Sequence, residues 1–166
     1  MYGVASKSKH HILTEYGATP IDYHTQDFVE VIRQAEPGGI DVVVDGMMRM
    51  DYIRRGLSLL RRGGRLVSFG EPEGFGVLFR ILGTVAAVNL LPNGKSFKLY
   101  GTSFYFIGDK QPFLEDWGSL FKLLEEGQIK PVIERKFPIL KAARANELLE
   151  SGTVTGNLVL LAPELL

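Results

Sequence analysis

The chain of 166 residues contains no cysteine, which excludes disulfides, thiolate zinc sites and cysteine nucleophiles. Its 19 basic and 19 acidic side chains cancel, so general electrostatic attraction to nucleic acid or to an anionic membrane is not expected. The longest apolar region, Phe75–Leu91, contains Arg80 and Asn89 and is shorter than the ~20 residues that cross a bilayer. A chain without disulfides and without a recognisable signal peptide is typical of the cytoplasm, where we expect this protein.

Three kinds of catalytic or ligand motif are also absent. There is no G-x-S-x-G turn for a serine hydrolase. There is no G-x-G-x-x-G turn for a dinucleotide or for a methyltransferase cofactor, because the glycines at 70–76 are not preceded and followed by the required elements. The histidines are His10, His11 and His24, and no acid or cysteine completes a metal-ligand spacing around them. We therefore predict surface histidines, no metal site and no catalytic residue.

One short apolar stretch organises the remaining predictions. Residues 39–46 read Gly-Ile-Asp-Val-Val-Val-Asp-Gly, and an unalternated run rich in Val favours a strand that is buried on both faces of a parallel sheet. The chain leaves this strand at Asp45-Gly46. Since open α/β sheets bind ligands at the carboxyl ends of their strands, the sequence predicts a nucleotide-type site at this place.

Strands alternate with helices of about ten residues along the whole chain. The predicted strands are Tyr2–Ala5, Thr19–Tyr23, Gly39–Asp45, Arg65–Phe69, Lys98–Phe106, Val132–Phe137 and Asn157–Ala162. The predicted helices are Lys7–Tyr16, Thr25–Ala35, Asp51–Arg62, Phe75–Leu91, Pro112–Glu126 and Leu140–Ser151. This alternation is typical of right-handed βαβ crossovers and a parallel sheet. Length and the lack of a long linker predict one domain over residues 1–166.

Several of these segments together resemble the medium-chain dehydrogenase/reductase superfamily, and most of all its zinc-free NADPH quinone reductases with the vesicle amine transport protein group. The segments that carry the resemblance are Val4–Ser6, Lys9-His10, Tyr16–Thr19, Ile21–Tyr23, Gly39–Asp45, Leu59–Gly70, Gly127–Pro131 and Gly156–Leu160. The resemblance implies an α/β fold: a Rossmann-like, doubly wound, mainly parallel sheet with helices on both faces, lacking the first βα unit. It also implies that residues 1–166 are a partial nucleotide-binding domain, from which the GroES-like catalytic domain is absent.

The cofactor expectation rests on two groups of residues. Where NAD enzymes carry an acid for the ribose hydroxyl, this chain has Ser6, followed by Lys7 and Lys9. A hydroxyl and an ammonium suit a 2′-phosphate and favour NADP (NADPH), and the alternative is a helix cap with solvated lysines. The resemblance places 2′-phosphate contacts at Ser6, Lys9 and Tyr23. The missing first unit would carry the helix N-terminus that receives the pyrophosphate.

The second group surrounds the nicotinamide half of the cofactor. It comprises Asp45 and Gly46, which end the organising strand, and four residues placed by the resemblance: Phe69, Gly70, Ser103 and Phe104. As the alternative, Asp45 caps the next helix, the glycine makes a turn and the aromatic residues belong to the core. After Asp45-Gly46 the family usually continues with small residues and paired glycines, whereas this chain has Met47-Met48-Arg49-Met50.

The aromatic strand Lys98–Phe106 is too apolar for an unprotected sheet edge. The resemblance implies that it joins two Rossmann domains in a homodimer, and an interior strand of one sheet is the alternative. We therefore expect the cofactor-binding portion of an NADPH-dependent quinone or enone oxidoreductase, which transfers hydride to a conjugated carbonyl and is incomplete for catalysis alone. The alternative is a non-catalytic, dimerising Rossmann-like binding or interaction module.

Overall fold

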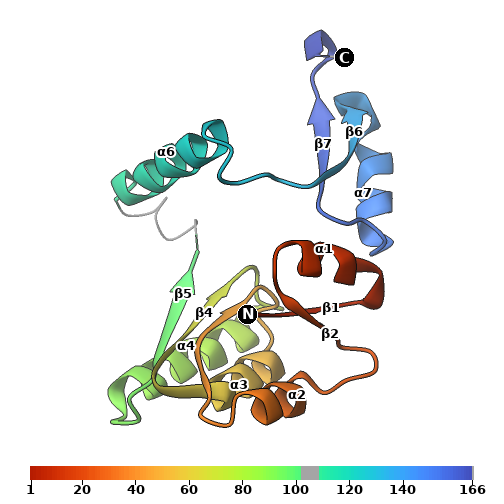
Figure 1. Cartoon of the computed structure of the whole chain (residues 1–166). Coiled ribbons are helices and arrows are strands. Elements are labelled where there is room, and N and C mark those ends of the chain that lie inside the picture. Colours follow the sequence, from red (N-terminus) through yellow and green to blue (C-terminus); the bar gives the residue numbers. More distant parts are fainter. Residues whose placement is uncertain (102–108, 166) are drawn as a thin grey trace. The chain divides into compact units, whose positions relative to one another are not determined.

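A computed structural model describes residues 1–101 and 109–165 of the chain. The chain divides into two compact units, Met1–Gly108 and Asp109–Leu166 (Figure 1), and each is described by itself below. That residues 1–166 form a single partial domain stays a prediction. Among the described residues, no helix is long and apolar enough to cross a membrane.

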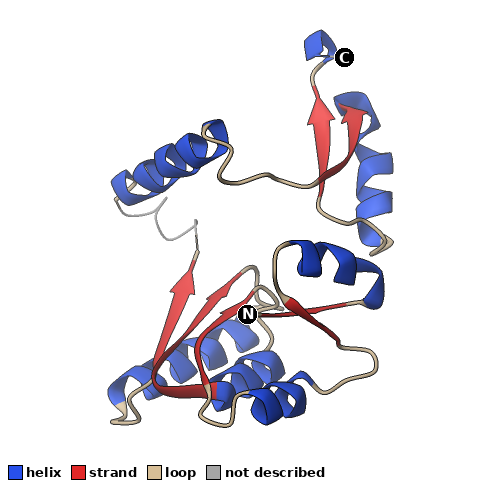
Figure 2. Cartoon of the chain, in the orientation of Figure 1, coloured by secondary structure: helices blue, strands red, loops and turns tan. Residues whose placement is uncertain are grey.

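The described residues of the first unit form five strands in two sheets, and all their pairings are parallel (Figure 2). Strands β1 (Tyr2–Ala5) and β2 (Thr19–Asp22) form one sheet. Strands β3 (Ile40–Asp45), β4 (Leu60–Phe69) and β5 (Ser96–Tyr100) form the other, in the order β3-β4-β5. The predicted parallel α/β architecture is therefore confirmed.

Helices lie on both faces of the β1-β2 sheet. These are α1 (His10–Glu15), which follows the short 3-10 helix Lys7–Lys9, and α2 (Phe28–Ala35). On one face, a Cβ added to Gly3 would lie 2.6 Å from a methyl carbon of Leu13 in α1. On the other face, Ile21 of β2 packs against Phe28 of α2. Coverage of both faces is the doubly wound arrangement that the sequence predicts.

Only one face of the β3-β4-β5 sheet is covered by described residues of this unit. Helices α3 (Met50–Leu59) and α4 (Phe75–Leu90) pack against it (Figure 1), around a core that contains Ile53, Leu66, Ile81 and Phe97. The predicted burial of the organising strand on both faces is wrong, because Val42 is 54% and Val44 is 67% exposed. Successive strand side chains alternate between faces, so only Val43 of this Val run reaches α3 and the core.

The boundary between α3 and β4 differs from the prediction. Helix α3 ends at Leu59, and β4 begins at Leu60 instead of Arg65. The glycines at 63 and 64 therefore do not end the helix but lie within the strand. A Cβ on Gly64 would meet the backbone oxygens of Arg61 and Ile40 at 2.9 and 3.0 Å. Glycine here permits the close approach of β3 and β4 at the place where their register shifts.

Helix α2 begins later than the predicted Thr25, at Phe28, and its N-cap is Asp27. The Asp27 carboxylate accepts hydrogen bonds from the amides of Val29 and Glu30, at 2.7 and 3.4 Å. It also accepts one from Arg55 of α3 at 2.7 Å. One carboxylate therefore accepts hydrogen bonds from two backbone amides at the start of α2, which have no partner within the helix, and also links α2 to α3.

We predict that Asp27→Ala lowers the urea midpoint of unfolding at neutral pH. The hydrogen bond from the Val29 amide, with smaller contributions from Arg55 and the Glu30 amide, holds the pKa of Asp27 below its ordinary value of 3.8. A lowered folded-state pKa gives stability that is present above the unfolded-state pKa and is lost as pH falls through the folded-state pKa. The measurement is urea unfolding across the acid range.

The matched control for this prediction is Asp27→Asn, which keeps an acceptor for the helix amides but removes the charge. We expect it to retain most of the midpoint at neutral pH, because Asn is as good an N-cap as Asp. A constant difference between wild type and Asp27→Ala throughout the acid range would contradict the assignment of the effect to the ionised cap.

The second unit contains helix α6 (Gln111–Glu125), strand β6 (Ile133–Pro138), a 3-10 helix (Ile139–Lys141), helix α7 (Ala142–Glu150), strand β7 (Asn157–Leu161) and a final 3-10 helix (Pro163–Leu165). Strands β6 and β7 pair in parallel, and α7 packs against both. Ala145 of α7 is buried. This unit therefore repeats the strand–helix–strand pattern on a smaller scale.

Candidate functional site

The carboxyl ends of β3 and β4 lie side by side, with Asp45 paired in register with Ser68. Ser68 is fully buried and Asp45 nearly so. The Ser68 hydroxyl donates to Oδ2 of Asp45, and the Met47 amide donates to its Oδ1 at 3.0 Å. Both carboxylate oxygens are therefore used inside the protein. The alternative that Asp45 caps the next helix is wrong, since α3 has Arg49 at that position.

Immediately beyond this pair, Gly46 and Gly70 bring two backbones close together. Gly70 has φ 121°, and a Cβ there would lie 3.0 Å from the carbonyl oxygen of Gly46. A Cβ on Gly46 would in turn lie 3.2 Å from the ring of Phe69. Phe69 is 46% exposed, so assigning this aromatic residue to the core is wrong. The structure thus brings together Asp45, Gly46, Phe69 and Gly70 of the predicted nicotinamide group.

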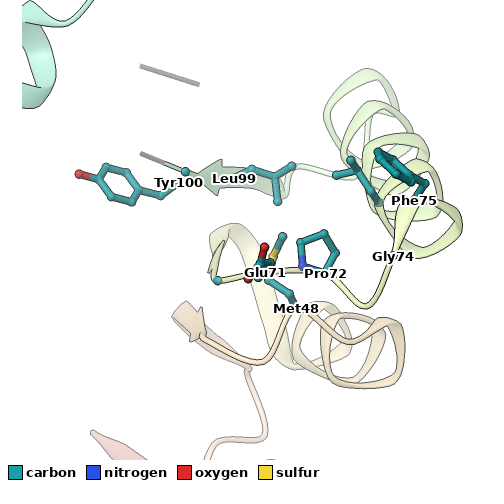
Figure 3. A pocket seen from close by; sticks show the side chains of 10 residues that line it. Met48, Glu71, Pro72, Gly74, Phe75, Leu99 and Tyr100 are labelled. Atoms are coloured by element: carbon teal, nitrogen blue, oxygen red, sulfur yellow. The ribbon is translucent and has the colours of Figure 1, made fainter. Parts of the chain in front are cut away.

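An apolar cavity of about 480 Å³ opens at the same edge of the sheet. Figure 3 shows side chains from the end of β5, the loop after β4 and the start of α4 around it. Its lining is Met48, Gly70, Glu71, Pro72, Gly74, Phe75, Leu78, Leu99, Tyr100 and Gly101. Among these lining residues, Glu71 is the one Asp, Glu, Lys, Arg or His. Such a cavity suits a flat apolar molecule better than an anion.

Met48 was missed by sequence reasoning as a residue of this site. It is buried in the core cluster, lines the cavity and has a φ of 51°. A residue other than glycine rarely adopts this left-handed conformation. The sequence contained one signal that could have identified Met48. The family usually has small residues and paired glycines here, and Met48 occupies a backbone position that suits glycine.

The second predicted group lies at the carboxyl ends of β1 and β2, where Ala5 pairs in register with Asp22. Ser6 and Tyr23 follow these two residues, so the structure places both at the same edge. The Ser6 hydroxyl lies 3.2 Å from that of Ser8 and does not cap the helix, whereas its carbonyl accepts from the Lys9 amide at 2.9 Å. Cofactor binding by Ser6, Lys9 and Tyr23 stays a prediction.

The loop after β2 is held by polar residues that sequence reasoning did not single out. Asp22 Oδ1 accepts from the His24 amide at 3.0 Å, and Gln26 Oε1 accepts from the Asp22 amide at the same distance. The Tyr23 and His24 rings lie 4.1 Å apart. An Asp that turns back on its own backbone is a common turn signal, and it could have identified this loop.

One histidine contradicts the surface prediction in part. His10 is half-buried, and its Nε2 lies 3.3 Å from the carbonyl oxygen of Ala5 at the end of β1. Ser103 and Phe104, as well as the second half of the predicted strand Lys98–Phe106, lie outside the described residues. The described strand β5 ends at Tyr100.

The donor set does not fit a zinc site. The chain has no cysteine, and among residues 1–101 and 109–165 no group of three or more His, Asp or Glu side chains is arranged to hold a metal. Structural zinc needs four such ligands and catalytic zinc usually three.

Comparisons with known proteins support the same fold and family. The family model described as zinc-binding dehydrogenase matches residues 16–160. The synaptic vesicle membrane protein VAT-1 homolog of Homo sapiens is 32% identical over 174 residues, which cover 98% of this chain and 44% of the relative. Quinone oxidoreductase 1 of Escherichia coli (strain K12) is 32% identical over 147 residues, which cover 85% of this chain and 42% of the relative.

Among solved structures, the CurF ER cyclopropanase from the curacin A biosynthetic pathway matches with a TM-score of 0.76 at 23% identity, over 98% of this chain and 47% of that chain. This likeness concerns the fold. The chain spans less than half the length of the curated relatives it matches. With the match over residues 16–160 and a parallel, doubly wound sheet, the chain belongs to the zinc-binding dehydrogenase family of the medium-chain dehydrogenase/reductase superfamily.

Proposed function

We propose that this chain is the cofactor-binding portion of an NADPH-dependent quinone or enone oxidoreductase. The observation that carries the proposal is the apolar cavity at the carboxyl ends of β4 and β5, bordered by the glycine backbone of the strand ends. Its lining suits an apolar ring such as that of a quinone. The similarity to quinone oxidoreductase 1 supports the same substrate class.

The chain's own residues would bind and orient the reactants. Ser6, Lys9 and Tyr23 would hold the 2′-phosphate of the cofactor through two hydroxyls and an ammonium. The closely approaching backbones at Gly46 and Gly70 would let a flat ring lie against peptide groups. When bound, NADPH supplies the hydride. No described residue is assigned as a proton donor for the reaction. We therefore propose that the chain is incomplete for catalysis alone.

A non-catalytic binding module is the second candidate. It is favoured by the exposed apolar side chains on one face of the β3-β4-β5 sheet, which include Val42, Val44 and Phe69. The predicted homodimer through Lys98–Phe106 stays a prediction. The cytoplasmic location also stays a prediction.

We predict that NADPH binds at least tenfold more tightly than NADH and that Lys9→Ala removes this preference. The loss of one charge-assisted hydrogen bond, worth about 1.5–3 kcal/mol, corresponds to a tenfold or larger change in Kd. The measurement is calorimetric titration of the purified chain with each cofactor. Lys7→Ala is the matched control, because it removes the same charge two residues away and is expected to keep the preference.

Two outcomes would contradict the proposed cofactor site. Equal affinity for NADPH and NADH would remove the role of Ser6, Lys9 and Tyr23 in binding a 2′-phosphate. No binding of either cofactor would favour the non-catalytic module, while the fold assignment would stand because it rests on the strand pairing and the family match.

A further inference from the structure

The apolar cavity at the ends of β4 and β5 contains one charged side chain in its described lining, that of Glu71. Figure 3 shows Glu71 together with Met48, Pro72 and Leu99, which are all apolar. Glu71 is exposed, and no described residue forms an ion pair with it. Its carboxylate is therefore open to a ligand that enters the cavity.

The basic side chains of the neighbouring elements do not line the cavity. Arg49 instead has its Nε 3.3 Å from Oδ1 of Asp51 in α3. Arg80 comes two residues after the lining residue Leu78 of α4, so the two side chains point about 200° apart around the helix. Lys98 of β5 points to the other face of the sheet from the lining residue that follows it, because strand side chains alternate. The negative charge of Glu71 is therefore not neutralised from these elements.

The amino end of α4 also borders the cavity, through Gly74 and Phe75. A helix amino end carries a partial positive charge of roughly half an elementary charge, which favours anions. The full charge of Glu71 is larger. The exposed Glu73, immediately before the cap position of α4, opposes the partial charge as well. The electrostatic potential at the cavity thus favours a cation.

Two aromatic residues add to the same preference. Phe75 and Tyr100 line the cavity, and their side chains are 81% and 41% exposed. The face of an aromatic ring attracts a cation, and quaternary ammonium groups are commonly bound by such rings. A carboxylate with aromatic and aliphatic neighbours is thus suited to a ligand that is apolar and positively charged.

We propose that Glu71 makes this cavity selective for an apolar ring that carries an ammonium group, and against one that carries a carboxylate or a phosphate. Glu71 is then a specificity-determining residue. The identity of the ring as a hydride acceptor rests on the proposed function, whereas the charge preference does not.

The test measures binding of three matched probes to the full chain without cofactor. Each probe is a naphthalene ring on a two-carbon chain that ends in trimethylammonium, in its neutral isostere tert-butyl, or in carboxylate. The measurement is equilibrium dialysis at low ionic strength. We expect the ammonium probe to bind about tenfold more tightly than the carboxylate probe, with the neutral probe between them. The ratio is expected to shrink in 1 M salt, where the Debye length is about 3 Å.

Glu71→Gln keeps the size of the side chain and removes its charge. We expect it to reduce the ratio between the ammonium and carboxylate probes to less than about threefold while the neutral probe binds as before. Glu73→Gln is the matched control, because it removes the same charge from the same loop at a residue that does not line the cavity. It is expected to keep most of the ratio.

A second pair of variants places the probes in the cavity. Phe75→Ala removes an exposed ring from the lining and is expected to weaken all three probes, the ammonium probe most. Phe79→Ala removes a ring that is 69% exposed on the next turn of α4, outside the lining, and is expected to weaken none of them. Both residues are exposed, so neither change disturbs the core.

Three results would overturn the proposal: equal binding of the three probes, a preference that persists in Glu71→Gln, or an equal loss of preference in Glu73→Gln. The cofactor titration keeps this inference separate from the proposed function. A charge preference in a chain that binds no NADPH would leave the Glu71 assignment standing and remove the proposed function. NADPH binding without a charge preference would do the reverse.

Discussion

Phe97→Ala is expected to lower the free energy of unfolding of the first unit by about 3–5 kcal/mol. The Phe97 side chain is only 1% exposed and belongs to the core cluster of the β3-β4-β5 sheet, with Ile53, Leu66 and Ile81. Truncation removes buried apolar surface and leaves a cavity that the strands and helices around it can fill only in part. The measurement is urea unfolding followed by circular dichroism.

The matched control is Phe79→Ala. Phe79 lies in α4 and is 69% exposed, so its removal changes little buried surface and replaces an aromatic residue with a better helix former. We expect a change of less than about 1 kcal/mol. Similar losses for the two variants would contradict the placement of Phe97 in the core.

Phe97 also affects the cavity through its backbone. Its carbonyl oxygen accepts from Asn89 Nδ2 at 2.8 Å, and its amide donates to Asn89 Oδ1 at 3.2 Å. These bonds join β5 to the end of α4, and both elements line the cavity. A less ordered β5 in Phe97→Ala would therefore also weaken ligand binding in the cavity, even where the unit remains folded.

The sequence predicted the elements well because periodicity and turn residues are local signals. Strand β3 and helix α4 were each placed to within one residue of their observed ends. The exposure of Val42 and Val44 was not predictable in the same way. A run of valines indicates a strand, but which faces of that strand are covered depends on helices that lie elsewhere in the chain.

The candidate site was predicted in part for the same reason. Strand ends are local features, so Asp45-Gly46 and Phe69-Gly70 were identified, and register pairing then brought them together. Pro72 and Phe75 line the cavity because of the path of the loop after β4, and no local sequence pattern specifies that path. The hydrogen bond from Ser68 to Asp45 joins residues 23 positions apart, and neither side chain predicts the other.

Ser68→Ala is expected to destabilise the first unit by about 3 kcal/mol, at the upper end of the cost of leaving a buried acceptor without its partner. Ser68 is fully buried, and its hydroxyl is a donor to Oδ2 of Asp45, which is itself 7% exposed. Alanine fills nearly the same space, so little of the loss comes from packing. The Met47 amide continues to satisfy Oδ1.

A double-mutant cycle with Asp45→Ala isolates this interaction. If the unpaired carboxylate causes the loss, Asp45→Ala/Ser68→Ala is less destabilised than the sum of the two single variants, because no buried acceptor is left without a donor. Ser96→Ala, which removes a half-exposed serine on β5 that accepts from Arg65 at 3.2 Å, is the control and should cost less than about 1 kcal/mol. Additive losses would mean that the two side chains contribute independently.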